Sequence, residues 1–247
     1  MLATQLKYDL LMFSRELFYF IFTIIVPPVG YLFMGQLFGD QIYAGGLSYV
    51  ETYTPSFILL ITFTVIFFAF GFDQVSNRAN GIEKRISISP VPKRVLLVSN
   101  ILRSIIITSF GFVFILLLGI ALYDLQISLL TIFISYLFFI LLNAVLLVIS
   151  SAIYSLFKQE KSALVFSIII FQVVMFTGDF SFPVSQMPDF VQLIANVNPI
   201  YHMNHLFTNV WNQLFSFDKN SLISIGYVLL IFAISLIIIQ ITNRKKV

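Results

Sequence analysis

The chain has 247 residues, of which 59% are hydrophobic, only 10% are charged and 29 are Phe. A soluble domain usually carries about 25% charged residues, so this chain has too little polar material to cover a water-facing surface. Its apolar runs are continuous rather than alternating, which predicts an all-α integral membrane protein. The chain contains no Cys, which excludes disulfides, thiolate catalysis and thiolate metal sites.

Residues 1–16 precede the first long apolar run. Leu6, Leu10, Phe13 and Leu17 recur at helical spacing, which predicts a short helix lying in the cytoplasmic membrane interface. A partly ordered tail is the alternative that this weak pattern leaves open. A cleaved signal peptide is disfavoured, because the apolar run that follows is too long and has no small-residue cleavage site.

Six apolar runs follow, each long enough to cross a bilayer as a helix. The predicted spans are residues 17–38, 56–72, 104–123, a stretch within 128–157, 162–178 and 221–242. In the first span, the pair Pro27-Pro28 is expected to kink or break the helix. The fifth span, with 17 residues, is at the short limit for crossing.

Basic residues are distributed unequally between the two sides of these spans. Thirteen of the 14 Lys and Arg residues fall on the side that carries both termini, and only Lys219 falls on the other. Lys and Arg near span ends resist translocation, so the pattern predicts that both termini are cytoplasmic. The formal charge of +3 therefore indicates a cytoplasmic face rather than a nucleic-acid surface.

Residues 77–95 form the largest predicted cytoplasmic loop and hold five of the 14 basic residues. Gly81 permits a tight turn before a short helical run, and Pro90 and Pro92 end that run. Ile82 and Ile86 lie four residues apart and would share one small apolar face. A loop that only fixes the orientation of the chain is the alternative.

Residues 179–220, between the fifth and sixth spans, are too apolar for a solvated loop. They are interrupted by Pro183, Pro188 and Pro199, so they are not expected to form a seventh span. The pattern predicts short re-entrant helices over residues 179–210 that enter the outer leaflet without crossing it.

Charged residues are absent from the centres of the predicted spans. Asp73, Arg103 and Asp179 lie near span ends, where interfacial snorkelling is the favoured interpretation. Intramembrane charges mark proton relays and ion paths, so their absence disfavours an ion-driven transporter.

Asn143 and Gln172 are the most central amides in the spans. Hydrogen bonding between helices is the favoured role, and a substrate path is the alternative. His202 and His205 have an H-x-x-H spacing, but their neighbours offer no third ligand, so no metal site is predicted.

No nucleotide-binding loop of the type G-x-x-x-x-G-K-[ST] occurs in the chain, and no catalytic constellation stands out. The chain is therefore not expected to be an enzyme or to carry a cofactor. Any energy for transport would come from a partner.

Two stretches together resemble the ABC transporter type-2 permease family. Residues 78–90 are similar to the family's segment R-x-x-G-T-x-E-x-x-x-x-[ST]-P between spans two and three. Phe182-Pro183, Pro188 and Asn198-Pro199 are similar to its signature between spans five and six. The chain departs from the first pattern at Ile82, where the family usually has Thr or Ser.

The resemblance implies a six-span half of an export channel in a prokaryotic plasma membrane, paired with a second copy or a related permease. It implies a separate ABC ATPase that binds ATP and Mg, and a cargo such as a drug, lipid, glycolipid or peptide. The residues it assigns to the ATPase-coupling helix are Arg78, Gly81, Ile82, Glu83, Lys84, Arg85 and Ile86.

Three other classes of function compete with the exporter. They are a membrane scaffold or immunity protein that transports nothing, a facilitative channel without ATP coupling, and an intramembrane enzyme. The missing catalytic set disfavours the enzyme. An adjacent reading frame with a nucleotide-binding loop would favour the exporter over the others.

Overall fold

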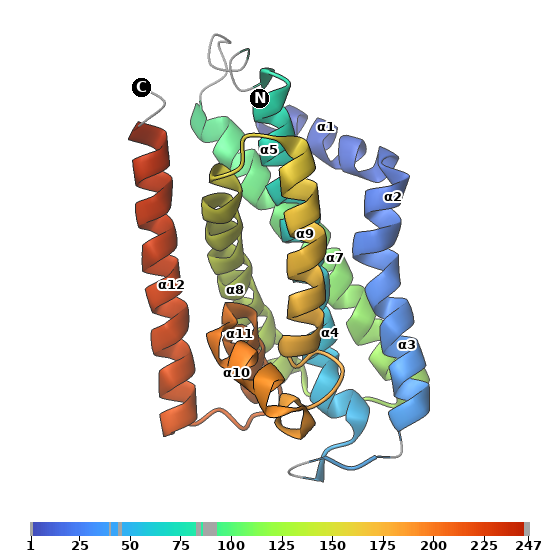
Figure 1. Cartoon of the computed structure of the whole chain (residues 1–247). Helices are drawn as coiled ribbons and strands as arrows, with labels where there is room; N and C mark the ends of the chain where they lie inside the picture. The colour runs from blue at the N-terminus through green and yellow to red at the C-terminus, as the bar shows by residue number, and fades with distance from the viewer. Residues whose placement is uncertain (1, 40, 44–45, 83–84, 86–92, 245–247) are drawn as a thin grey trace.

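The computed structural model describes residues 2–39, 41–43, 46–82, 85 and 93–244, and its regular structure is helical (Figure 1). Six of the described helices are long and apolar enough to cross a membrane, as the sequence predicts. These candidate spans are Ile21–Phe38, Tyr49–Ala79, Val98–Tyr123, Leu129–Ser155, Glu160–Thr177 and Lys219–Thr242. Both termini lie at the same end of the bundle (Figure 1).

The predicted N-terminal helix is present as α1, Leu2–Arg15. It lies across the end of the bundle instead of along it (Figure 1). Asp9 of α1 is buried and accepts hydrogen bonds from Ser99 Oγ at 2.7 Å and Gln5 Nε2 at 2.8 Å. Because Ser99 belongs to α7, Lys93–Tyr123, this contact holds α1 against the bundle, and the alternative of a partly ordered tail is wrong.

The first span runs without a break through α2 (Leu17–Phe20), η1 (Ile21–Ile25) and α3 (Val26–Phe38). Of the kink or break expected at Pro27-Pro28, a break does not occur, and the helix is distorted by a π-helical segment just before the prolines. Pro27 has no N–H for the carbonyl four residues earlier, that of Thr23. Thr64 Oγ1, from the second span, lies 3.2 Å from that carbonyl and 2.8 Å from the carbonyl of Ile61, and its one hydrogen is shared between the two.

The second span is the central helix of the bundle and consists of α4 (Tyr49–Thr64), η3 (Val65–Gly71) and α5 (Phe72–Ala79). In the most apolar 18-residue stretch of this span, 89% is buried inside the protein. The corresponding share for the last span, in α12 (Lys219–Arg244), is 17%. The second span begins seven residues before the predicted start at 56, so the outer loop is shorter than expected. Ser48 and Glu51 form a reciprocal capping box that starts the helix there.

The π-helical segment η3 packs closely on α8, Leu129–Ser155. A Cβ at Gly71 would lie 2.3 Å from Cε2 of Tyr154, so a larger residue would separate the two helices. Ser150 of α8 donates from Oγ to the carbonyl of Ile66 at 3.2 Å. α9, Glu160–Thr177, covers the other side of Tyr154, whose hydroxyl is hydrogen-bonded to Ser167.

The segment after α9 lies at the end of the bundle opposite the termini (Figure 1). It contains the short 3-10 helix η4 (Val184–Gln186), α10 (Asp189–Val197) and α11 (Pro199–Trp211). None of these helices is long enough to cross a bilayer. α11 contacts α4, α8 and α12, and therefore closes this end of the bundle.

Candidate coupling site

Arg78 lies in the last turn of α5, where the predicted coupling loop begins. Its guanidinium donates from Nη1 to the carbonyl of Ser155 at 3.0 Å and from Nη2 to the carbonyl of Tyr154. These carbonyls end α8, and the last carbonyls of a helix have no partner within it. The cation also opposes the negative end of the helix dipole. Arg78 thus joins the start of the loop to the end of α8.

Asn80 makes a second connection from the same turn. Its Nδ2 donates to Glu160 Oε1 at 2.9 Å and to the carbonyl of Ser76 at 3.0 Å. Glu160 is the first residue of α9. The first residues of the loop are therefore tied to both sides of the connection between α8 and α9.

Gly81 provides the predicted tight turn, with a φ of +68° that favours glycine. Its N–H donates to the carbonyl of Arg78 at 3.1 Å, and the N–H of Arg85 donates to its carbonyl at 3.2 Å. Ile82, which follows Gly81, is 37% exposed. Glu83, Lys84 and Ile86 lie outside the described residues, so the coupling helix as a whole stays a prediction.

Asp73 and Arg103 form an ion pair between α5 and α7, with 3.2 Å between Oδ2 and Nη2. The Arg103 guanidinium also lies 4.3 Å from the ring centroid of Phe70. Arg103 is only 9% exposed, so the expected snorkelling of this side chain to the interface is wrong. The side chain of Asp73 is 35% exposed, and its snorkelling stays a prediction. Each charge finds its partner on the neighbouring helix, which sequence spacing does not reveal.

The structure does not bring the two central amides together. Asn143 is fully buried between α7 and α8, where its Oδ1 accepts from Ser104 Oγ at 3.1 Å and its Nδ2 donates to Thr108 Oγ1 at 2.6 Å. These contacts support the interhelical role. Gln172 is exposed on α9, and no hydrogen bond of its side chain occurs within the described part of the chain. A role of either amide in a substrate path stays a prediction.

The proline-containing outer signature forms helix caps. Asn198 ends α10 and begins α11, where its Oδ1 accepts from the N–H of Ile200 at 2.9 Å. Pro199 occupies the first position of α11, where a missing N–H costs nothing. Pro188 lies at the cap position directly before α10, and Pro183 lies at the cap position directly before η4. Phe182, the remaining residue, packs its ring at 5.3 Å from that of Phe38.

α10 presents an apolar face to the surroundings of the protein. Phe190, Leu193 and Val197 follow helical spacing and are 66%, 68% and 65% exposed. A face of this kind is typical of a helix that lies in a membrane interface. The observation supports immersion of residues 179–210 in the outer leaflet, which stays a prediction.

Asp179 organises the turn that follows α9. It has a φ of +59°, which Asp tolerates better than most residues, and its Oδ1 accepts from the N–H of Val184 at 2.8 Å. Burial raises the pKa of Asp179 from its ordinary value of 3.8 to about 6, and the Val184 N–H opposes part of that rise. Asn204 of α11 donates to its carbonyl at 2.8 Å.

The two histidines of α11 make different contacts. His202 is buried between Ser224 and the carbonyl of Asn196, at 3.0 and 2.9 Å from its two ring nitrogens. Burial lowers the pKa of His205. Across the described residues, no three His, Cys, Asp or Glu side chains are grouped so that they could hold a metal ion.

Residues 34–241 match the protein family described as ABC-2 family transporter protein. The match includes the loop after α5 and the whole outer segment. The chain belongs to the ABC-2 transporter family. No curated protein matches the chain.

This membership confirms the resemblance that the residues indicate. An ABC-2 permease is the membrane component of a transporter, and the six candidate spans agree with a multi-pass membrane protein. Membership also implies association with an ABC ATPase subunit.

The contacts of Arg78 and Asn80 with α8 and α9 were not predicted from the sequence. Their partners lie 76 to 80 residues away in the chain, so no local pattern reports them. The capping box at Ser48 is different, because its S-x-x-E spacing is a readable signal.

Proposed function

We propose that this ABC-2 permease is the transmembrane subunit of an ATP-driven exporter for an apolar or amphipathic cargo, such as a drug, lipid, glycolipid or peptide. ATP and Mg bind to a separate ATPase subunit, and this chain hydrolyses nothing. The spans carry apolar and aromatic side chains, and the described ion pair of Asp73 and Arg103 lies near one end of the spans, where the Asp73 side chain is 35% exposed. These features suit an amphiphile better than an ion.

The observation that carries the proposal is the anchoring of the loop at residues 77–95. An ATPase that changes shape can move the spans only through a rigid contact. Arg78 and Asn80 tie the start of the loop to the end of α8 and the start of α9, and α7 begins at Lys93, within the last part of the loop. A force applied to this loop would therefore act on three spans at once.

The proposal also includes the topology of the chain in the membrane and its assembly into a channel. The chain is one transmembrane domain whose termini face the cytoplasm of a prokaryotic cell. Residues 1–16 lie in the inner interface, and residues 179–210 re-enter the outer leaflet. Two six-span chains, identical or related, form the channel among membrane lipids, and nucleic acid has no part in it.

A charge-preserving exchange tests the coupling directly. Exchanging Glu83 and Lys84 keeps the net charge of the loop and hence the orientation of the chain. We expect the altered permease to insert and to bind its ATPase, but to lose ATP-dependent transport in proteoliposomes. Replacing Ile82 and Ile86 by Ser tests the apolar face in the same way.

The outcome of this exchange separates the exporter from its alternatives. Wild-type transport by both variants would show that the loop only orients the chain. Cargo movement that needs no ATP would favour a facilitative channel. A purified chain that carries no ATPase and moves no cargo would favour a scaffold or immunity protein.

A further inference from the structure

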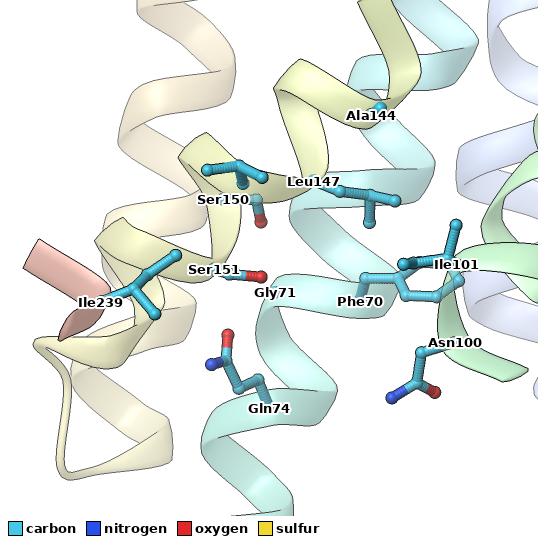
Figure 2. A pocket seen from close by; sticks show the side chains of 11 residues that line it. Phe70, Gly71, Gln74, Asn100, Ile101, Ala144, Leu147, Ser150, Ser151 and Ile239 are labelled. Carbon is cyan, nitrogen blue, oxygen red and sulfur yellow. The ribbon is translucent and has the colours of Figure 1, made fainter. Parts of the chain in front are cut away.

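A cavity of about 520 Å³ lies between η3, α5, α7, α8 and α12 (Figure 2). Its size falls in the range of small-molecule sites, about 300–1,000 Å³. Arg78 and the residues of the outer segment do not line it. The cavity is therefore separate from the coupling contacts already described.

Polar and apolar side chains occupy opposite ends of the cavity. Figure 2 shows the amides of Gln74 and Asn100 at one end and Ala144 and Leu147 at the other. Within the described residues, the side chains of Gln74, Asn100 and Ser151 make no hydrogen bond to the protein. Three polar groups are thus free to bind a ligand, and the lining contains no charged side chain.

The polar end of the cavity lies at the depth of the lipid head groups, and its apolar end lies at the depth of the hydrocarbon core. The central helix from Tyr49 to Ala79 has 31 residues. That length is about 46 Å, which exceeds the roughly 30 Å hydrocarbon core. Gln74 lies about 8 Å before the end of this helix, at head-group depth. Ala144 lies about 16 Å before the end of α8, within the hydrocarbon.

The walls of the cavity are held in place by close packing. Gly71, which lines the cavity, has no room for a Cβ because Tyr154 would lie 2.3 Å from it. It ends a π-helical segment of seven residues, a feature that is frequent at functional sites. Phe70 forms another wall, and the Arg103 guanidinium, 4.3 Å from its ring centroid, fixes that ring.

We propose that this cavity binds one alkyl chain of an uncharged amphiphile from the surrounding leaflet, such as a monoacylglycerol. The chain lies against Ala144 and Leu147, and the hydroxyl or ester head group is hydrogen-bonded by Gln74, Asn100 and Ser151. A charged head group is disfavoured, because a charge taken from water without a partner is costly. The proposal concerns binding and does not depend on ATP coupling.

The test uses the full-length chain in nanodiscs and a monoacylglycerol that carries a diazirine in the middle of its chain. Photolysis followed by mass spectrometry should place the label on the peptide that contains Ala144 and Leu147. Ala144→Phe fills the apolar end, and we expect labelling to fall by about tenfold. Ala233→Phe is the matched control, because Ala233 is also an exposed Ala on a spanning helix but does not line the cavity.

A second variant tests the polar end without adding bulk. Combining Gln74→Leu and Asn100→Leu should reduce labelling by about threefold to tenfold while leaving the thermal midpoint in place. A probe with the same chain and a carboxylate head should label weakly. Equal labelling of Ala144→Phe and Ala233→Phe, or equal labelling by the two probes, would overturn the proposal.

The same probe identifies the source of the amphiphile in the reconstituted ATPase complex. Labelling that persists during ATP turnover indicates a resident membrane lipid. Labelling that is lost during turnover indicates exported cargo. Both results require the site, whereas a failure of the exporter proposal would leave labelling of the isolated chain unchanged.

Discussion

The hydroxyl of Thr64 lies 3.2 Å from the carbonyl of Thr23, one turn before Pro27 in the first span, and shares its hydrogen with the carbonyl of Ile61 at 2.8 Å in its own helix. The proline cannot supply the usual N–H to the carbonyl of Thr23, so the second span supplies a hydroxyl in its place. The two π-helical segments, η1 and η3, meet beside this bond. Phe22 and Phe68, one from each segment, pack with ring centroids 5.1 Å apart.

Replacing Thr64 by Val should lower the free energy of unfolding by about 1 kcal/mol, because the carbonyl of Thr23 loses a donor. Thr62→Val is the control, since Thr62 is also buried but bonds only to its own helix at Ile58. In a Pro27→Ala background the new N–H can serve Thr23, so Thr64→Val should cost less. Thermal midpoints in detergent measure all four variants. Equal losses with and without Pro27→Ala would contradict the explanation.

The raised pKa of Asp179 predicts a pH-dependent effect on stability. The folded protein holds this proton up to about pH 6, whereas the unfolded chain releases it near 3.8. Stability therefore falls as the pH rises from about 4 to 6, and the full penalty is present above that window. Asp179→Asn removes the charge and keeps an acceptor for Val184, so it should stabilise the protein at pH 7.5 by up to about 3 kcal/mol.

Asp218 is the control for the Asp179 prediction, because its pKa is shifted in the opposite direction. It is fully exposed and accepts from the N–H of Ser221 at 3.2 Å, and this bonding lowers its pKa. A lowered pKa stabilises the folded state above the ordinary value of 3.8, so Asp218→Asn should give no gain at pH 7.5. A thermal midpoint for Asp179→Asn that exceeds wild type equally at pH 4 and pH 7.5 would contradict the assignment.

The sequence predicts the spans well because hydropathy and length depend on continuous stretches of chain. It predicts their irregularities poorly. The π-helical segments at Ile21–Ile25 and Val65–Gly71 contact each other across the two spans, whereas the sequence predicts only a kink or break at the prolines of the first span. The early start of the second span was predictable, because Ser48 and Glu51 have the spacing of a capping box.

At the candidate coupling site too, the sequence predicts local features but not contacts between residues far apart in the chain. The tight turn expected at Gly81 is present, with an N–H that donates to the carbonyl of Arg78, whereas the coupling helix that the resemblance implies stays a prediction. The resemblance gives no indication that the Arg78 guanidinium donates hydrogen bonds to the last carbonyls of α8, because the contact with Ser155 joins residues 77 positions apart. The pairing of Asp73 with Arg103 was missed for the same reason.

Asn143 and Gln172 should respond differently to replacement by Leu. Asn143→Leu leaves Ser104 and Thr108 without their amide partner, so we expect a loss of about 1–3 kcal/mol in unfolding free energy. Gln172→Leu should change stability by less than about 0.5 kcal/mol, because Gln172 is exposed. Transport by Gln172→Leu at unchanged stability then tests the substrate path. A stable Asn143→Leu protein would contradict the interhelical role.

The orientation of the chain can be tested without background substitutions, because the chain has no Cys. Ala79 and Asp218 are both exposed and lie at opposite ends of the bundle. A membrane-impermeant maleimide should label Asp218→Cys in intact cells and Ala79→Cys only after permeabilisation. The reverse result would invert the proposed topology.

The coupling proposal makes its sharpest prediction at Arg78. Lys preserves the positive charge and the orientation of the chain, but its ammonium cannot span the carbonyls of Tyr154 and Ser155 as the planar guanidinium does. Arg78→Lys should therefore loosen the loop from α8 and reduce cargo transported per ATP by about tenfold. Arg15→Lys is the control, because Arg15 is an exposed Arg at the end of α1 and lies outside the coupling loop.

The measurement uses the permease reconstituted with its ATPase in proteoliposomes, recording cargo movement and ATP hydrolysis together. A coupling role for Arg78 requires that hydrolysis continues while transport falls, since the ATPase keeps its own active site. A purely structural role would lower the amount of folded complex and leave the ratio of transport to hydrolysis unchanged. If Arg78→Lys and Arg15→Lys both give the same ratio as wild type, the contact between Arg78 and α8 does not transmit force.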